Sequence, residues 1–206
     1  MSSLRLLIAT RNRGKLQEFR ALLEELSIEL CDLNSFPAIV PVAETGSTFA
    51  ENASLKAVGY ARQAGLMTLA DDSGLEVKAL GDAPGVLSAR YAGEGASDSQ
   101  RVEKLLSELS NIEVMDRAAR FVSVVAISDS SGKVLNVSGG VCDGAITEAP
   151  RGTNGFGYDP IFLPEGFDRT FAELTAEVKN EISHRAQAFK GSAKFLRSLT
   201  LRSRAG

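Results

Sequence analysis

Short apolar runs and helically spaced apolar positions follow one another in the first part of the chain. The run Leu4–Ala9 is largely apolar and suits a buried strand. After the polar turn at residues 10–14, apolar positions recur three or four residues apart, as on one face of an amphipathic helix: Leu16, Phe19, Leu23 and Leu26. A strand, a tight polar turn and a helix in this order predict an α/β fold.

Capping boxes predict where two later helices begin. In this motif a Ser or Thr and the residue three positions further on bond each other's backbone. One box is formed by Thr48 and Glu51, and the other by Ser97 and Gln100. Apolar residues follow both boxes at helical spacing, so we expect helices from about residues 48 and 97.

The remaining elements include strands with turns between them. Leu66–Ala70 predicts a short strand that leads into a turn at residues 71–74. The runs at residues 121–127 and 133–141 predict a β-hairpin. A short strand at 161–163 and a final helix from Ser183 follow. We therefore expect a mixed α/β fold with antiparallel pairs, rather than a simple doubly wound sheet.

Composition indicates the size and class of the protein. The chain has 206 residues, of which 44% are hydrophobic and 24% are charged, as in a soluble chain with a core rather than a disordered one. The length suffices for one domain, or for one domain in two lobes. Since no repeat, low-complexity tract or Pro/Gly-rich linker interrupts it, the sequence predicts no domain boundary.

Charge and rare residues exclude several classes of protein. A formal net charge of −3 excludes a protein that wraps nucleic acid by bulk charge, although a local basic pocket still suits a polyanion. One histidine excludes His-rich metal sites, and two distant cysteines, Cys31 and Cys142, exclude a Cys-based zinc site. No run approaches the ~20 apolar residues that span a bilayer. The start of the chain is a poor signal peptide, so we expect a cytoplasmic protein.

The polar turn after the first strand is a candidate phosphate site. The free N–H groups and the dipole at a helix N-terminus favour an anion. The turn combines two neutral donors, a glycine and three cations: Thr10, Asn12, Gly14, Arg11, Arg13 and Lys15. Its spacing is not that of a P-loop. The alternative is a capped helix start with a solvated basic face.

Three carboxylates form a candidate metal site. Asp71 and Asp72 follow a predicted strand, where successive side chains point to opposite faces, so one is able to face a cleft while the other braces the loop. Glu44 lies in a separate loop. Oxygen ligands of this kind suit Mg²⁺, which takes one or two carboxylates together with substrate phosphates. The alternative is turn chemistry, because Asp residues in turns bond their own backbone.

A glycine-rich loop and the start of the last helix are candidates for holding a base. The loop at residues 155–159 places planar rings beside glycines, where a ring can stack on a base. Residues 183–185 put a cap and two basic side chains at a helix N-terminus, where the dipole disfavours cations unless an anion or electron-rich edge is near. The alternatives are core aromatics, a structural histidine and, for Lys56, Arg90 and Lys179, surface charges.

Six short segments together resemble one enzyme family. They read TRNRGK at 10–15, ETGSTFAENA at 44–53, ADDSGL at 70–75, PGVLSARY at 84–91, GFGYDPIF at 155–162 and SHR at 183–185. In this order, over most of the chain, they resemble the inosine triphosphate pyrophosphatase family, the dITP/XTP pyrophosphatases that clear deaminated purine nucleotides. The SARY segment looks like the bacterial type.

The resemblance implies a fold, a reaction and partners. The expected fold is a single two-lobed domain over residues 1–206, with a long central mixed β-sheet flanked by helices and the active site in the cleft between the lobes. The expected reaction is Mg²⁺-dependent hydrolysis of ITP, dITP and XTP or dXTP to the monophosphate and pyrophosphate. A homodimer is expected, and neither a nucleic acid polymer nor a membrane is an expected partner.

The resemblance also implies roles for residues that match the family's motifs. Asp72 would accept the proton of the attacking water and, with Glu44, bind Mg²⁺, and Asp71 could assist the metal. The implied substrate-binding residues are Thr10, Arg11, Asn12, Arg13, Gly14, Lys15, Lys56, Ser73, Phe156, Gly157, Tyr158, Asp159, Lys179, His184 and Arg185. The last three are candidates for selecting a 6-keto purine, because donors aimed at the 6-position reject the 6-amino group of adenine.

Three other functions remain open at this point. They are a Maf-type pyrophosphatase acting on pyrimidine or modified nucleotides, a nucleotide-binding sensor that does no chemistry, and a structural α/β module with basic turns. The segments at 156–159 and 183–185 argue against the first. Intact Glu44, Asp72 and Lys15 argue against the second.

Overall fold

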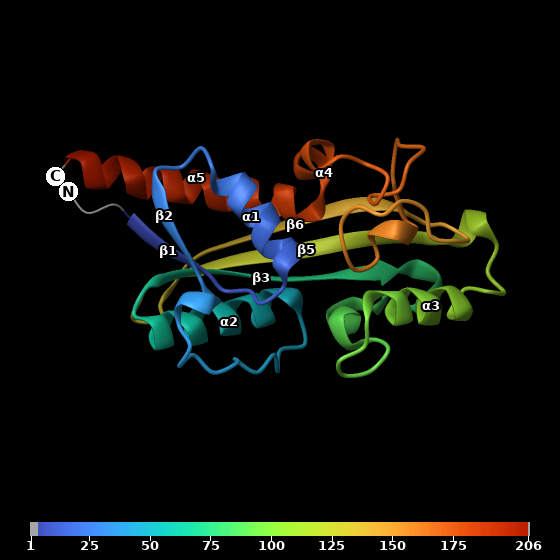
Figure 1. The fold of residues 1–206 in the computed structure, drawn as a ribbon, viewed down its shortest axis with the longest axis horizontal. Helices are drawn as coiled ribbons and strands as arrows, with labels where there is room; N and C mark the ends of the chain where they lie inside the picture. The colour runs from blue at the N-terminus through green and yellow to red at the C-terminus, as the bar shows by residue number, and fades with distance from the viewer. Residues whose placement is uncertain (1–3, 206) are drawn as a thin grey trace. The chain divides into compact units, whose positions relative to one another are not determined.

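A mixed β-sheet with helices packed on its faces forms the protein, as the computed structural model shows for residues 4–205 (Figure 1). Residues 1–3 of the predicted start segment lie outside the described residues. The strands are Leu4–Ile8 (β1), Ile28–Asp32 (β2), Met67–Val77 (β3), Ala83–Pro84 (β4), Ala118–Ser128 (β5), Val134–Ile146 (β6) and Phe162–Pro164 (β7). The α-helices are Arg13–Leu23 (α1), Phe49–Ala64 (α2), Asp98–Glu108 (α3), Ala176–Ile182 (α4) and His184–Ala205 (α5).

The sheet combines parallel and antiparallel pairs, as predicted. Its order is β2-β1-β3-β5-β6-β7, and β4 pairs with β3 at the end of that strand. β1 runs parallel to β2 and to β3, whereas β3 with β4 and β6 with β7 are antiparallel. The expected hairpin is present as β5 and β6, which are neighbours in both chain and sheet.

The chain folds into two compact units. The first unit contains the described residues up to Asp72, Ser123–Gly140, and those from Arg185 onward. The second contains Ser73–Val122 and Val141–His184. Because these boundaries fall inside β3, β5 and β6, each of these strands contributes residues to both units.

In the first unit, successive strand residues face two different cores. Leu6 and Ile8 of β1 pack in a cluster with α1 and α5, where Phe19 is buried. Leu7 packs on the other side of the sheet, in a cluster with Ala57 of α2. Figure 1 shows α1 and α5 on one face of these strands and α2 on the other. Burial on both faces explains why Leu6, Leu7 and Ile8 of β1 are consecutive apolar residues rather than alternating apolar and polar ones.

The second unit has an aromatic core. The rings of Phe121, Phe162 and Phe171 lie with their centroids 4.6, 5.9 and 5.0 Å apart. Leu105 of α3 belongs to the same cluster, and Ile182 of α4 packs against it. The helices α3 and α4 lie on opposite sides of the strands of this unit (Figure 1).

The structure corrects four of the predicted elements. Residues 71–74 are not a turn, because β3 continues through them to Val77; pairing with neighbouring strands outweighs the local turn preference of Asp and Gly. The first helix ends at Leu23, short of Leu26. The strand after the glycine-rich loop begins at Phe162, because a 3₁₀ turn at Asp159–Ile161 precedes it. The last helix begins at His184, one residue after Ser183, and Ser183 is the C-cap of α4.

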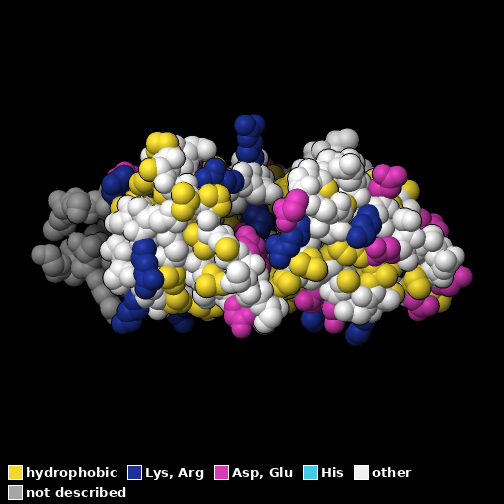
Figure 2. All heavy atoms as spheres, turned by 90° about the horizontal axis from the view of Figure 1, so that it is seen from below, with side chains coloured by type: hydrophobic (Ala, Val, Ile, Leu, Met, Phe, Trp, Pro, Cys, Tyr) yellow, Lys and Arg dark blue, Asp and Glu magenta, His cyan; other side chains and the backbone are white. Residues whose placement is uncertain are grey.

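Charges of both signs lie on the face drawn in Figure 2. Lys and Arg side chains of the described residues lie there among Asp and Glu side chains. Cys31 and Cys142 are free thiols, and burial raises the pKa of Cys142 to about 11. Within residues 4–205, no helix combines the length and apolar character needed to cross a membrane.

Candidate active site

The polar turn between β1 and α1 is ordered by its own side chains. Asn12 is the N-cap of α1, and its Oδ1 accepts the backbone N–H of Lys15 at 3.0 Å. The hydroxyl of Thr10 accepts the N–H of Asn12 at 3.1 Å. The first turn of α1 contains no acidic residue, so no carboxylate of the helix itself offsets the positive end of its dipole.

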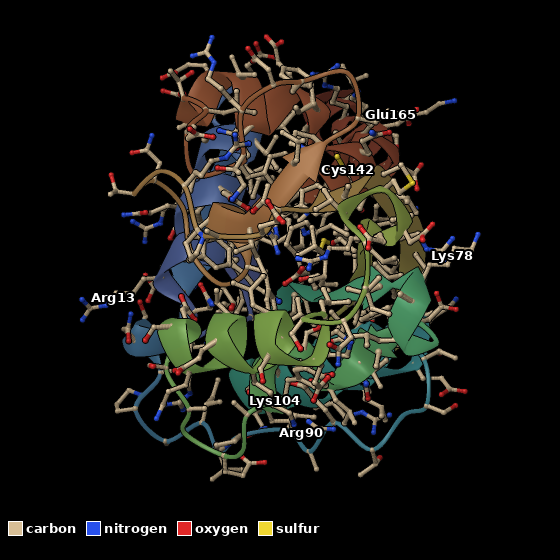
Figure 3. All side chains as sticks on the ribbon, turned by 90° about the vertical axis from the view of Figure 1, so that its right-hand side faces the viewer. Arg13, Lys78, Arg90, Lys104, Cys142 and Glu165 are labelled. Atoms are coloured by element: carbon tan, nitrogen blue, oxygen red, sulfur yellow. The ribbon has the colours of Figure 1, made fainter. Side chains whose placement is uncertain are left out.

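The cations of this turn point in different directions. Arg13 is exposed and extends away from the ribbon (Figure 3), and Arg11 donates to the carbonyl of Ile39 at 3.3 Å. Lys15 turns inward instead, and its Nζ lies 2.9 Å from Oδ1 of Asp71. A solvated basic face therefore describes Arg13 but not Lys15.

Asp71 and Asp72 lie on opposite faces of β3, as the strand alternation predicted. Asp71 faces α1 and α5, where its Oδ2 accepts from Arg185 at 3.4 Å and from Ser123 at 3.3 Å. Asp72 faces α2, where its Oδ1 accepts from Lys56 at 2.7 Å. Both carboxylates are about 5% exposed or less. Because they sit inside a strand rather than in a turn, they do not bond their own turn backbone as the alternative interpretation required.

The environment of Asp71 stabilises its ionised form. Burial alone would raise its pKa, but the charges of Lys15 and Arg185 outweigh burial and hold the pKa of Asp71 well below its usual range. Burial lowers the pKa of Lys15 by more than Asp71 raises it. Arg185 also pairs with Glu18 of α1, so a protein carboxylate stands on each side of this guanidinium.

On the α2 side, one lysine joins two carboxylates. Lys56 Nζ lies 2.7 Å from Asp72 and 3.4 Å from Glu44. Burial raises the pKa of Asp72 even though Lys56 opposes it. Burial would lower the pKa of Lys56, but the carboxylates, led by Asp72, outweigh that effect and raise it.

The residues on this side fit a magnesium ion. Oδ2 of Asp72 is buried and has no hydrogen-bond partner, and Lys56 already shows that positive charge is stabilised between Asp72 and Glu44. Within the described part of the chain, no three His, Cys, Asp or Glu side chains gather to hold a metal by themselves. Two carboxylates are enough when substrate phosphates and water complete the shell, as is usual for Mg²⁺. Asp71 is not part of this group, because it faces α1 and α5.

In the second unit, the loop at residues 155–159 is closed by a buried ion pair. Oδ2 of Asp159 accepts from Lys179 at 2.5 Å and from the N–H of Phe156 at 2.8 Å. Lys179 Nζ also lies 4.8 Å from the centre of the Phe156 ring. Tyr158 is a core residue whose hydroxyl donates to the carbonyl of Ser88 at 3.0 Å. Of the two rings in the loop, Phe156 is the one that stays partly exposed.

The remaining predicted site residues are buried or half-buried. His184 is buried and stacks on Phe121, with ring centroids 4.6 Å apart and planes 11° from parallel. Ser73 is half-buried within β3. Lys56 and Lys179 are buried, so neither is the surface charge of the alternative interpretation, while Arg90 is half-buried.

Sequence reasoning missed Glu18, Ser123 and Asp98, which contact predicted site residues. Glu18 lies three positions after Lys15 on α1, a spacing that places both on one face of the helix. Its partner is Arg185 of α5, however, and no sequence spacing indicates that pair. Ser123 and Asp98 reach Asp71 and Gly157 only through tertiary structure, and no local pattern indicates them.

The fold and the charges define a class of protein: a mixed α/β protein with a lysine at a helix N-terminus and a carboxylate pair joined by a second, buried lysine. The model of the Ham1 family matches residues 6–195, and the chain belongs to this family. The resemblance read from the six sequence segments is thereby confirmed.

Relatives of known name match nearly the whole chain. The dITP/XTP pyrophosphatase of Syntrophobacter fumaroxidans is 52% identical over 183 residues, covering 89% of this chain and 78% of that protein. The dITP/XTP pyrophosphatase of Bacillus subtilis is 47% identical over 190 residues, covering 92% of this chain and 96% of that protein. The solved structure of a HAM1 protein from Coxiella burnetii has a TM-score of 0.81 and 43% identity, covering 98% of this chain and 100% of that one.

Proposed function

We propose that this protein hydrolyses non-standard purine nucleoside triphosphates (ITP, dITP and XTP or dXTP) to the monophosphate and pyrophosphate. The reaction would remove deaminated purines from the nucleotide pool. One observation carries the proposal: the buried carboxylate of Asp72 bonds Lys56 through one oxygen, and its other oxygen has no hydrogen-bond partner. The names of the relatives support the same reaction and substrate class.

In this proposal the first unit binds the triphosphate. Lys15, Lys56 and the N–H groups at the start of α1 neutralise negative charge on the phosphates, most of all on pyrophosphate as it leaves. Asp71 keeps Lys15 at the end of the helix where phosphates would lie. The turn residues Thr10, Arg11, Asn12, Arg13 and Gly14 complete the proposed phosphate site.

Asp72 has the central chemical role in the proposal. It accepts a proton from the water that attacks the α-phosphorus, and the bond from that phosphorus to the bridging oxygen breaks, which releases pyrophosphate. Glu44 and Asp72 would hold Mg²⁺, which when bound neutralises phosphate charge and acidifies bound water. Lys56, held by both carboxylates, keeps them close together.

The second unit is proposed to recognise the base. Phe156 stacks on the purine, because the ring of Tyr158 is already used in the core. Hydrogen-bond donors on Lys179 and His184 of this unit, and on Arg185 at the start of α5, favour a 6-keto oxygen over the amino group of adenine. Ser73, Gly157 and Asp159 line the base. Mg²⁺ dependence, a homodimer and a cytoplasmic location belong to the same proposal.

The test is a substrate panel with separate product assays. Purified protein and Mg²⁺ are incubated with ITP, dITP, XTP, ATP and GTP, and pyrophosphate and orthophosphate are measured separately. We expect pyrophosphate from the first three, little turnover of ATP and GTP, and no activity when a chelator replaces Mg²⁺. Orthophosphate as the product would place the cut at an outer phosphate and contradict the mechanism. A nucleotide-dependent rise in melting temperature without product would support a sensor instead.

A further inference from the structure

The loop at residues 155–159 is held from outside by a carboxylate of α3. The backbone N–H of Gly157 donates to Oδ2 of Asp98 at 2.7 Å. Asp98 is the first residue of α3, and its Oδ1 pairs with Arg101 one turn further on. Arg101 donates in turn to the carbonyl of Ala89 at 3.0 Å. Asp98 therefore connects Gly157 to a helix that is itself bonded to the SARY motif at Ala89.

The start of α3 is capped without Asp98. Ser97 accepts the N–H of Gln100 through its hydroxyl at 3.2 Å, and Gln100 accepts the N–H of Ser97 through its side chain at 2.9 Å. Both partners of the capping box are thus present. Because the box is complete, the carboxylate of Asp98 is available to bond a segment outside the helix.

The bond from Asp98 fixes the backbone next to Phe156. The N–H of Phe156 is held by Asp159, and the N–H of the following residue is held by Asp98. Gly157 has a φ of +62°, a left-handed conformation that glycine adopts at little cost. With an acceptor on each of two successive N–H groups, the backbone that carries the Phe156 ring has little freedom to rotate.

We propose that Asp98 is a positioning residue for base recognition, which holds the Phe156 ring in the orientation that stacks on a purine. This inference rests on the proposed function and adds a residue to it. A ring ordered before binding loses less conformational entropy when the base arrives. Asp98 would therefore act on substrate affinity rather than on the chemical step, which the proposal assigns to Asp72.

The kinetic test separates positioning from general structure. We expect Asp98→Ala to raise the KM for ITP about tenfold, as loss of one charge-assisted hydrogen bond implies, with kcat nearly unchanged. Asp98→Asn should restore much of the affinity, since its amide oxygen can accept the Gly157 N–H. Glu103→Ala is the matched control, because it removes an exposed carboxylate from the same helix. Inhibition by inorganic tripolyphosphate, a probe of the phosphate end alone, should be equal in all variants.

A fluorescent reporter tests the same inference without turnover. The sequence contains no tryptophan, so Phe156→Trp introduces a single indole at the ring position. In that background we expect Asp98→Ala to lower the emission anisotropy of the free protein and to weaken quenching by IMP, whereas Glu103→Ala should change neither. Melting curves of each variant check that the fold persists, as expected for a side chain that is 47% exposed.

The outcomes distinguish the two proposals. If the wild type releases no pyrophosphate from ITP, the proposed function fails, and the anisotropy still decides whether Asp98 orders residue 156. If the wild type is active and Asp98→Ala changes neither the KM nor the anisotropy, the role of Asp98 is overturned. A fall in kcat with an unchanged KM would also overturn it, because positioning of the base predicts the reverse.

Discussion

The two units bury charge in different ways. In the first, Asp71 is shared by Lys15 and Arg185, and on the opposite face of β3 Asp72 is bound to Lys56. In the second, Asp159 and Lys179 form a pair beside the Phe156 ring. Buried charges persist when they are paired and hydrogen-bonded, and both units satisfy this condition. They differ in how the partners are distributed.

The two buried carboxylates also differ in how many hydrogen bonds their Oδ2 atoms accept. Oδ2 of Asp159 accepts two hydrogen bonds, whereas Oδ2 of Asp72 is buried without one. An oxygen with unused acceptor capacity is available to a metal ion or a water molecule, and a saturated oxygen only holds its neighbours in place. This difference supports the proposal that the first unit provides the chemistry and that the second provides a fixed surface for the base.

The largest expected effect comes from removing charge at Asp72. Asp72→Asn keeps the size of the side chain but loses the base, so we expect pyrophosphate release from ITP to fall roughly 10²- to 10⁴-fold, the usual contribution of such catalysis. The same change in the second unit, Asp159→Asn, should act mainly on KM, because it loosens the loop that carries Phe156. Steady-state assays of both variants provide the measurement.

A fall in the rate with Asp159→Asn and a rise in KM with Asp72→Asn would contradict the assignment of the chemistry to the first unit and of base binding to the second. A near-wild-type rate in Asp72→Asn would remove Asp72 from the mechanism. Circular dichroism and melting curves serve as the control that each variant is folded, so that a lost rate is not a lost structure.

A second, smaller effect concerns stability. Lys179→Met removes the ammonium partner of buried Asp159 and should lower the free energy of unfolding by about 3 kcal/mol, as breaking a buried ion pair does. Lys15→Met should lower it by less, because Asp71 keeps the guanidinium of Arg185. Urea unfolding followed by circular dichroism compares the two. Equal losses of unfolding free energy in the two variants would show that a second cation beside Asp71 does not compensate for the loss of Lys15.

The smallest effect distinguishes the helix caps of the two units. The capping box of α2 uses Glu51, whereas that of α3 uses Gln100, which does not titrate. Hydrogen bonds from Ser47, first from its hydroxyl and then from its backbone, and from the Thr48 backbone lower the pKa of Glu51. A carboxyl whose pKa is lowered by folding stabilises the fold above its unfolded pKa, about 4.3, and this stabilisation is lost as the pH falls through the folded pKa.

Melting temperatures from pH 7 down to pH 3 therefore provide the test. We expect Glu51→Gln to keep the box but to lose its pH dependence, so its melting temperature should fall less steeply below about pH 4 than that of the wild type. Gln100→Glu should introduce the same dependence at α3. Parallel curves for wild type and Glu51→Gln would contradict the assignment.

Local patterns predicted the parts of the fold that depend on neighbours in the chain. Both capping boxes formed at Thr48 and Ser97, and the alternation along β3 placed Asp71 and Asp72 on opposite faces. Such features involve residues a few positions apart, so the sequence contains all the partners.

Features that depend on distant partners were not predicted. β2 contains acidic residues and only three apolar ones, yet it forms a strand because β1 pairs with it from Leu4↔Ile28 onward. The helix α4 is a short element of seven residues, capped by Thr175. The contacts of Ser123 with Asp71 and of Asp98 with Gly157 join residues more than fifty positions apart in the sequence. No local sequence pattern predicts such contacts.

Because Asp71 and Asp72 point to opposite faces of β3, the number of residues in this part of the strand limits which insertions and deletions the protein tolerates. Side chains alternate with a period of two, so the parity of a position decides whether it meets α1 and α5 or α2. One residue inserted between Leu69, which is in register with Ile8 of β1, and Asp71 would exchange the surroundings of Asp71 and Asp72. Two inserted residues would restore each to its own side. Insertions and deletions in this stretch of the strand should therefore be tolerated only in even numbers.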